Sequence, residues 1–168
     1  MDSLLNDPIQ SEIEDLRLEL VTKARQAALR KLDRRERSSG DIKVFLKDQG
    51  FSQETISAAI QELIGKNYIN DECYAKIVVR EQALSGKGPT WIQMKLKQKG
   101  IAVERTRIES LIQELGETSE LELAKKLVLR KYSEAKKNPA IARKAIQALL
   151  RRGFSYAIAR AAIYASED

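Results

Sequence analysis

Apolar residues recur at helical spacing along most of the chain, and three of the apolar segments end in the same short joint. The joints are centred on Gly50, Gly100 and Gly153, and each has a leucine four residues before the glycine and a large apolar residue directly after it. The glycines recur at intervals of roughly 50 residues, a period typical of repeat architectures built from one supersecondary unit. The pattern therefore predicts three copies of one helical unit.

Each joint has the chemistry to end one helix and start another. A glycine in the left-handed conformation closes the last turn of a helix, and the apolar residue after it packs back onto that turn. Ser52 and Ser155 then stand where a side-chain oxygen can cap the next helix. Ala102 occupies this position in the middle joint and cannot cap, so we expect either a weaker joint or a helix after Gly100 that begins a residue or two later.

Polar residues just before other apolar stripes predict where further helices begin. Ser38 and Ser119 each stand three residues before an acidic residue, as in a capping box. Asn70 fits the N-cap of a following helix, and Asn138 does the same before a proline. Together with the joints, these signals predict three helices in each unit.

Three apolar stripes indicate which helix faces are buried. The clearest stripe ends at Gly65 and consists of Ile56, Ala59, Ile60, Leu63 and Ile64. A second stripe, which ends at Gly116, consists of Ile108, Leu111, Ile112 and Leu115. The helix after Asn70 carries apolar residues, including Ile77 and Leu84, around most of its circumference, so we expect it to be buried on more than one side.

No segment alternates apolar and polar residues as a strand does, so the sequence predicts an all-α fold of three tandem three-helix repeats. We expect an acidic helical extension at residues 1–22 and repeats at 23–69, 70–117 and 118–168. The extension holds six acidic residues and one basic residue, Arg17. Charge runs usually face solvent, so a solvated extension is the simpler interpretation, and folding back against the basic repeats is the alternative.

The chain contains no histidine, which excludes catalysis by Ser-His-Asp or Cys-His groups and histidine metal sites. Its lone cysteine, Cys73, has no histidine to activate it, and we interpret it as a buried or half-buried packing residue. Ser85-Gly86-Lys87-Gly88 lacks the first glycine and the final Ser or Thr of a phosphate-binding loop. These absences exclude most familiar hydrolase chemistry, and we expect no metal or cofactor.

No hydrophobic run approaches the roughly 20 residues that a membrane span needs. The acidic N-terminal region is unlike a signal peptide or an Arg-rich transit peptide. The sequence therefore predicts a cytoplasmic protein without a membrane partner.

Five short motifs occur in a fixed order between about residues 24 and 163. They are Arg35-x-x-Ser38-x-x-Asp41-Ile42, Asn67-Tyr68-Ile69-Asn70-Asp71-x-x-Tyr74-Ala75, Lys87-Gly88-Pro89-x-x-Ile92-x-x-x-Leu96-x-x-Lys99-Gly100-Ile101, Arg130-Lys131-Tyr132 and Arg151-Arg152-Gly153-Phe154. In this combination the chain resembles the RecX family of bacterial RecA regulators. The family usually has Glu and Leu where this chain has Asp41 and Ile42, and an acidic residue where Asn70 stands, but both changes keep the capping or packing chemistry.

The resemblance implies an elongated, curved array of three three-helix units that binds the RecA nucleoprotein filament. Members of the family lie in the groove of the filament and restrain the ATPase, strand-exchange and co-protease activities of RecA in recombination, DNA repair and the SOS response. They are not enzymes. Some members also bind DNA, so single- or double-stranded DNA is a further candidate partner, and we expect the free protein to be monomeric.

The net charge of the chain is +6, and the basic excess lies in the repeats. Basic side chains gain affinity for nucleic acid by displacing its counterions, although a lysine-rich face can also simply be solvated. Lys95 and Lys99 are one helical turn apart and repel each other, a cost that an anionic partner would relieve. The candidate contact residues are Lys87, Lys95, Lys97, Lys99, Arg130, Lys131, Arg143, Lys144, Arg151 and Arg152.

Aromatic residues among these cations raise the alternative of stacking on bases. Only 5% of the chain is aromatic, and Tyr74 and Trp91 fall on core stripes, which favours packing for both. The position of Tyr68 is not determined by the pattern.

Two other functions are open to a basic helical chain. One is a helix-turn-helix-like protein that binds duplex DNA in transcription, but the predicted third helices, near Gln53, Arg105 and Tyr156, begin without a convincing set of base-reading side chains. The other is a purely structural scaffold, which explains the repeats but not the charge.

Overall fold

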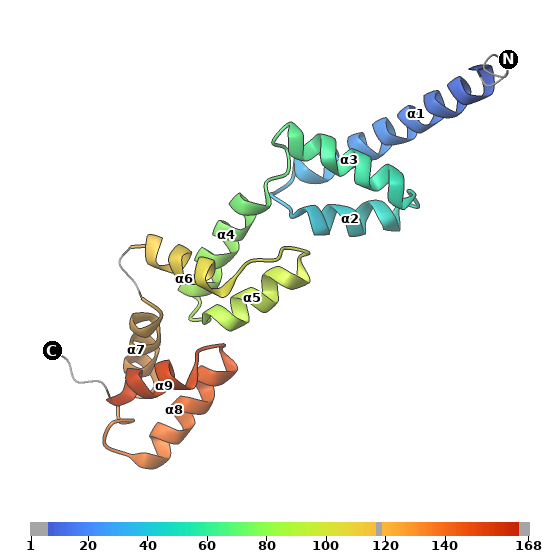
Figure 1. Cartoon of the computed structure of the whole chain (residues 1–168). Helices are drawn as coiled ribbons and strands as arrows, with labels where there is room; N and C mark the ends of the chain where they lie inside the picture. Colours follow the sequence, from blue (N-terminus) through green and yellow to red (C-terminus); the bar gives the residue numbers. More distant parts are fainter. Residues whose placement is uncertain (1–6, 117–118, 165–168) are drawn as a thin grey trace, which may run out of the picture. The chain divides into compact units, whose positions relative to one another are not determined.

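The structure is a computed structural model that describes residues 7–116 and 119–164 (Figure 1). In these ranges the chain forms nine α-helices and no strand, which confirms the predicted all-α fold and its grouping into three sets of three helices. The helices are α1 (Asp7–Leu32), α2 (Ser39–Asp48), α3 (Gln53–Gly65), α4 (Asp71–Leu84), α5 (Pro89–Gln98), α6 (Arg105–Glu114), α7 (Glu120–Lys131), α8 (Pro139–Arg151) and α9 (Tyr156–Tyr164). No helix in the described part of the chain is long and apolar enough to cross a membrane.

The chain divides into two compact units, and the boundary between them in the sequence lies between Tyr74 and Ala75, inside α4. The predicted repeat boundaries remain a prediction, and the boundary between 117 and 118 falls outside the described residues.

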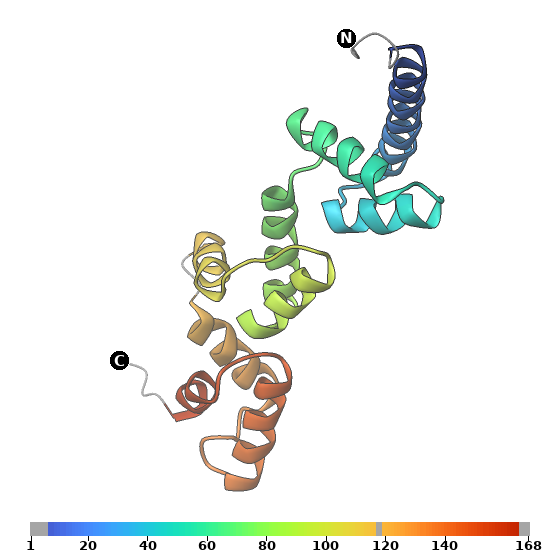
Figure 2. The same cartoon turned by 45° about the vertical axis from the view of Figure 1, so that its right-hand side comes forward.

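The first unit has its own core between α1, α2 and α3. Its fully buried side chains are Ala24, Ala28, Ile42, Leu46, Ile56, Ala59, Leu63 and Ile69. Arg25 of α1 pairs with Glu62 of α3 at 2.6 Å. The Asp71 carboxylate accepts hydrogen bonds from the Ser39 backbone N–H at 2.8 Å and from the Ser39 hydroxyl at 2.5 Å, and so caps α2 from outside that helix. In both views α1 extends beyond α2 and α3 (Figures 1 and 2).

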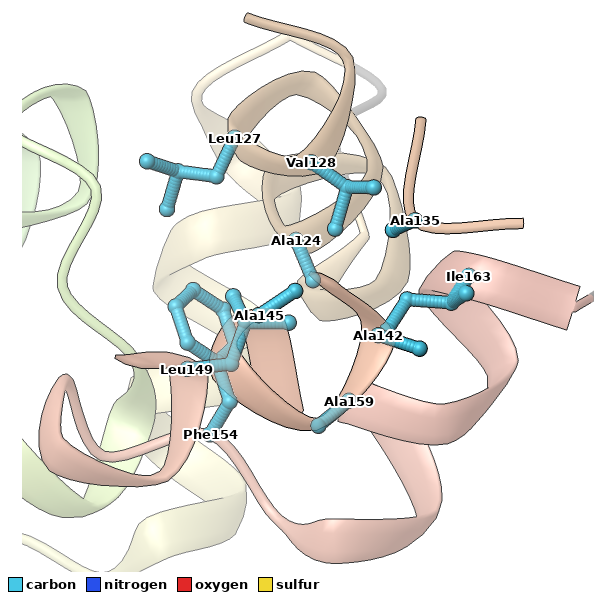
Figure 3. Close-up of a cluster of buried hydrophobic side chains, with 10 residues drawn as sticks. All are labelled: Ala124, Leu127, Val128, Ala135, Ala142, Ala145, Leu149, Phe154, Ala159 and Ile163. Carbon is cyan, nitrogen blue, oxygen red and sulfur yellow. The ribbon is translucent and has the colours of Figure 1, made fainter. Parts of the chain in front are cut away.

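The second unit contains a core cluster formed by α7, α8, α9 and the segments that join them (Figure 3). Its members are Ala124, Leu127, Val128, Ala135, Ala142, Ala145, Leu149, Phe154, Ala159 and Ile163. Alanines at helical spacing let the helix backbones approach closely, while Leu149 and Phe154 fill the remaining space. Leu127 differs from the rest, because its side chain points away from the other labelled residues in Figure 3.

The three glycine joints have the predicted conformation. Gly50, Gly100 and Gly153 have φ angles of 85°, 77° and 87°, which lie in the left-handed region. In each joint the N–H of the apolar residue after the glycine bonds to the carbonyl of the leucine before it, at 3.0 to 3.2 Å, as in a Schellman motif. The joints are thus three copies of one helix stop.

The helices that follow the joints begin as expected. The hydroxyls of Ser52 and Ser155 accept backbone N–H groups from the first turns of α3 and α9 at 3.2 Å. The middle joint has no such cap, and α6 begins only at Arg105, with Glu104 at its N-cap and no side-chain capping bond. The predicted delay after Ala102 is confirmed.

The other predicted N-caps are also confirmed. Ser38 and Ser119 each accept the backbone N–H three residues ahead, at 3.0 and 3.2 Å. Asn70 and Asn138 accept backbone N–H groups at 3.0 and 2.9 Å.

Several burial predictions are wrong. Ile64, Ile77 and Leu115 are 49%, 40% and 40% exposed, and Leu84 is 75% exposed. The buried stripe of α4 contains only Ala75, Val78, Val79 and Ala83. Cys73 is exposed rather than packed, because it lies two residues before this stripe and therefore on another face of the helix. Helix α3 does end at Gly65, but the left-handed residue that follows it is Asn67, with φ at 57°.

Candidate nucleic-acid interface

In the second unit, the joint after α8 is bonded directly to the first turn of α5. The carbonyl oxygen of Arg152 accepts the N–H of Gly88 at 2.7 Å, and that of Gly153 accepts the N–H of Thr90 at 3.3 Å. A Cβ atom on Gly88 would lie 2.6 Å from the Gly153 carbonyl, so only glycine allows this approach. The loop between α4 and α5 is thereby held against the end of α8.

The Arg152 side chain strengthens the same contact. Its Nη1 atom donates to the carbonyl oxygens of Ser85 at 3.3 Å and Gly86 at 3.2 Å. Arg152 is one of the predicted contact residues, but the structure shows that it is half-buried and that its guanidinium is already bonded to the loop. It positions the loop and adds a positive charge to the surface beside it.

A hollow of about 300 Å³ opens beside this contact, and four of the predicted cations line it. We call it the basic hollow, and its lining consists of Lys87, Leu127, Lys131, Tyr132, Ala148, Leu149, Arg151 and Arg152. No acidic side chain is part of this lining. Lys131 and Arg151 are exposed, whereas Lys87 is half-buried and its Nζ lies 4.3 Å from the centre of the Trp91 ring. An anion in the hollow would meet positive charge from three segments of the chain.

The other six predicted contact residues lie outside the basic hollow. Lys97 lines a separate open groove beside α5. Lys95 and Lys99, each two residues from Lys97 in the sequence, are half-buried. Arg143 and Lys144 are exposed on α8. The remaining residue, Arg130, lines a different hollow formed by α4, α6 and α7.

The sequence did not assign a role to Tyr132, which forms part of the wall of the basic hollow. The signal was its place directly after Arg130 and Lys131 in one of the short motifs. Tyr74 and Trp91 are half-buried, and Tyr68 is 57% exposed. Trp91 therefore combines packing with a cation–π contact to Lys87.

Arg105, which the sequence did not single out, joins α6 to two other helices. Its guanidinium donates to Glu109 at 2.6 Å, to the Thr90 hydroxyl at 2.6 Å and to both carboxylate oxygens of Glu120 at 3.2 and 3.0 Å. Burial raises the pKa of the Glu120 carboxyl above its ordinary value, although Arg105 and a backbone hydrogen bond involving Ser155 oppose this shift. Arg105 thus holds the starts of α5 and α7 next to α6.

Comparison with known families matches three segments of the chain. Residues 24–63 match the model of the first three-helix domain of RecX, residues 70–104 match the second, and residues 118–163 match the third. The chain belongs to the RecX family. This confirms the resemblance drawn from the five short motifs.

Relatives in the RecX family cover most of this chain. The chain is 34% identical to the regulatory protein RecX of Streptococcus sanguinis over 90% of its own length and 58% of that protein. It is 30% identical to the regulatory protein RecX of Streptococcus gordonii over 94% of its length and 60% of that protein. The chain thus spans about three-fifths of the length of these curated relatives.

Solved RecX structures have the same fold. The crystal structure of RecX from Lactobacillus salivarius aligns with a TM-score of 0.73 and 27% identity, covering 87% of this chain and 96% of that one. A second crystal structure of a regulatory protein RecX aligns with the same TM-score and identity over 90% of this chain and 75% of that one.

Proposed function

We propose that this RecX-family protein binds the RecA nucleoprotein filament in the cytoplasm and modulates it, mainly by inhibition. The activities affected would be ATP hydrolysis, strand exchange and co-protease action in recombination, DNA repair and the SOS response. The observation that carries the proposal is the match of three RecX domains in their family order. The names of the curated relatives, which are regulatory proteins, support it.

The basic hollow is the proposed contact with the phosphate backbone of the filament DNA. Lys131 and Arg151 are exposed at the hollow, and no acid lines it. Contacts of this kind contribute affinity through counterion release and are independent of base sequence, as a protein that acts along a whole filament requires. The α5 lysines Lys95, Lys97 and Lys99 are proposed as a second contact surface.

The mechanism requires binding and no chemical step. The chain has no histidine, and the described residues contain no cluster of His, Cys, Asp or Glu that could hold a metal. Regulation would follow if the repeats bridge neighbouring RecA protomers and favour a filament state that turns over slowly. A bound protein shifts such an equilibrium only as far as its affinities for the two states differ.

The arrangement of the third helices argues against a sequence-specific reader of duplex DNA. Arg105, the cation at the start of α6, already donates to Thr90, Glu109 and Glu120. At the start of α3, the Gln53 amide donates to the Ser57 hydroxyl at 3.2 Å. Recognition helices need free polar side chains at these positions.

The direct test is the ATPase activity of RecA on single-stranded DNA. Adding the purified chain at amounts below one molecule per RecA protomer should slow ATP hydrolysis. Normal hydrolysis at equimolar protein would contradict the proposal. Preferential binding to one duplex sequence, without any effect on RecA, would instead support the helix-turn-helix alternative.

A further inference from the structure

The N-terminal part of α1 presents an apolar surface that is exposed to solvent. Every residue from 8 to 20 is exposed, and the first fully buried residue of the helix is Ala24. Four apolar side chains recur at intervals of four, three and four residues along this part: Ile9, Ile13, Leu16 and Leu20, with exposures of 69%, 43%, 59% and 39%. We call them the α1 stripe. Figures 1 and 2 show this part of α1 beyond α2 and α3.

Acidic residues lie between and beside the members of the α1 stripe in the sequence. Residues 7–20 contain five acidic residues, Asp7, Glu12, Glu14, Asp15 and Glu19, and one basic residue, Arg17. The stripe covers fewer than two heptads, whereas a coiled coil needs about three or more. Pairing of two α1 helices would also bring two negative segments together. The stripe has instead the spacing of a helix that binds in a groove through anchors at i, i+4 and i+7.

The second unit contains an apolar hollow of about 240 Å³, formed by the end of α4, by α6 and by α7. We call it the apolar groove, and its lining consists of Ala83, Leu84, Gly86, Ile112, Leu115, Leu123, Lys126, Leu127 and Arg130. Leu84 is 75% exposed and Leu115 is 40% exposed, so large apolar surfaces face solvent here.

The charge of the apolar groove is opposite to that of the α1 stripe. Lys126 and Arg130 both line the groove and stand one helical turn apart on α7, and no acidic residue is part of the lining. The chain thus carries an acidic apolar helix and a basic apolar groove. The charges beside the two apolar surfaces are therefore opposite in sign.

We propose that the α1 stripe of one copy binds in the apolar groove of a second copy of this chain. The stripe would cover Leu84 and Leu115, and its acids would lie near Lys126 and Arg130. Because the two surfaces differ, the contact is heterologous and joins copies head to tail into an open row. The inference does not depend on the proposed function.

The contact is small, and interfaces that bury less than about 1,200 Å² in total are generally weak. Dilute protein should therefore be monomeric, as expected for the free protein. At higher concentration the weight-average mass, measured by sedimentation equilibrium on the full chain, should rise steadily without a plateau at the dimer. A constant monomer mass up to millimolar protein overturns the proposal.

Disulfide trapping identifies the surfaces in contact. In a Cys73→Ser background, one full-length copy carries Ile13→Cys and a second copy, distinguished by mass, carries Leu84→Cys. Mild oxidation of the mixture should give mainly the mixed disulfide dimer. Predominant pairing of two Ile13→Cys copies would show that α1 binds α1. Efficient formation of a disulfide within one chain that carries both changes would show an intramolecular contact. Either result overturns the proposal.

Charge exchange tests the complementarity. Lys126→Glu with Arg130→Glu should lower the association constant at least about tenfold, because acids would then face acids. Combining that double change with Glu12→Lys and Asp15→Lys should restore most of the association. Lys43→Glu with Lys47→Glu is the matched control, since both lysines are exposed one helical turn apart on α2, lie outside both surfaces and change the net charge by the same amount. Equal association of the reversed, restored and control variants would exclude the groove as the binding site.

Discussion

The carbonyl oxygen of Arg152 accepts a hydrogen bond from the backbone N–H of Gly88 at 2.7 Å, although the two residues belong to different repeats of the chain. At this contact the backbone of the third glycine joint lies directly on the first turn of α5. The joint therefore has two roles in the second unit: it ends α8, and it supports the loop that carries Lys87. At the corresponding joint of the first unit, by contrast, no atom lies within 4 Å of a Cβ atom built on Gly50.

Two glycines with the same backbone conformation should therefore differ in their tolerance of a side chain. Gly50 and Gly153 have φ angles of +85° and +87°, but a Cβ atom would meet nothing within 4 Å at Gly50, whereas it would clash with the backbone of Trp91 at Gly153. We expect Gly50→Ala to lower the free energy of unfolding by about 1 kcal/mol, the cost of the left-handed conformation. Gly153→Ala should cost about 2–4 kcal/mol, because the clash adds to that cost.

Urea unfolding followed by circular dichroism at 222 nm measures both changes. Equal losses of unfolding free energy in the two variants would show that the structure around Gly153 and Trp91 accommodates the added methyl group without further destabilisation.

Reversal of charge at the basic hollow should weaken the effect on RecA. Lys131→Glu with Arg151→Glu should reduce inhibition of RecA ATP hydrolysis. On single-stranded DNA, the slope of log affinity against log salt should become shallower by roughly 0.7 for each phosphate that the variant no longer neutralises. Lys136→Glu with Lys137→Glu changes the net charge equally at two exposed positions between α7 and α8, outside the hollow and outside the candidate contact residues, and it should retain both properties. Identical effects of the two double variants would point to net charge rather than to the hollow.

The lysines of α5 provide a separate test of the second proposed surface. Changing Lys95, Lys97 and Lys99 together to Glu should weaken inhibition of RecA while leaving the helical content intact. Circular dichroism and the ATPase assay measure the two properties. Unchanged inhibition would place the contact surface elsewhere.

Loss of Arg105 should destabilise the second unit in a pH-dependent way. The Glu120 side chain is only 12% exposed, and Arg105→Ala would leave its carboxylate without a counter-ion. We expect a loss of about 1–3 kcal/mol at pH 7, less than for a fully buried pair because Arg105 is partly solvated. Lys125→Ala, which breaks a solvated pair with Glu122, should cost less than about 1 kcal/mol.

The direction of the pH effect follows from the raised pKa of Glu120. Burial holds this pKa above its ordinary value of 4.5, and removal of Arg105 should raise it further. A carboxyl whose pKa is higher in the folded than in the unfolded state favours folding when it is protonated. Its contribution to the free energy of unfolding is therefore fully present below the ordinary pKa of 4.5 and is lost as the pH rises through the pKa of the folded state. The difference in unfolding free energy between Arg105→Ala and the parent should therefore shrink from pH 7 toward pH 4.5. A difference that is constant or grows on acidification would rule out an uncompensated Glu120.

The features that the sequence predicted correctly depend on contacts within a few residues. The helix stops at Gly50, Gly100 and Gly153 close through hydrogen bonds back to the preceding leucine, and each cap is made to an amide in the next turn. The late start of α6 after Ala102 is also a local effect, since the missing side-chain cap lies next to it. Local chemistry of this kind can be read from the order of residues alone.

The candidate site depends on contacts between distant residues, which the pattern of residues does not specify. Arg152 and Gly86 are 66 residues apart in sequence, and the bonds from Arg152 to Gly86 and Ser85 distinguish it from exposed cations such as Arg151. The pairing of Arg105 with Glu120 likewise requires the folded second unit, whereas its partner Glu109, four residues along the same helix, could have been expected. Exposure of Cys73 was missed because α4 buries a narrower stripe than its composition suggested.

Leu127 lines both the basic hollow and the apolar groove, and its side chain turns away from the rest of its core cluster in Figure 3. A ligand that fixes the rotamer of Leu127 on one side also changes the shape of the wall on the other side. If the two hollows take the partners proposed here, their binding free energies are linked through this one side chain. Linkage is reciprocal, so the factor by which nucleic acid alters the affinity between copies must equal the factor by which a second copy alters the affinity for nucleic acid.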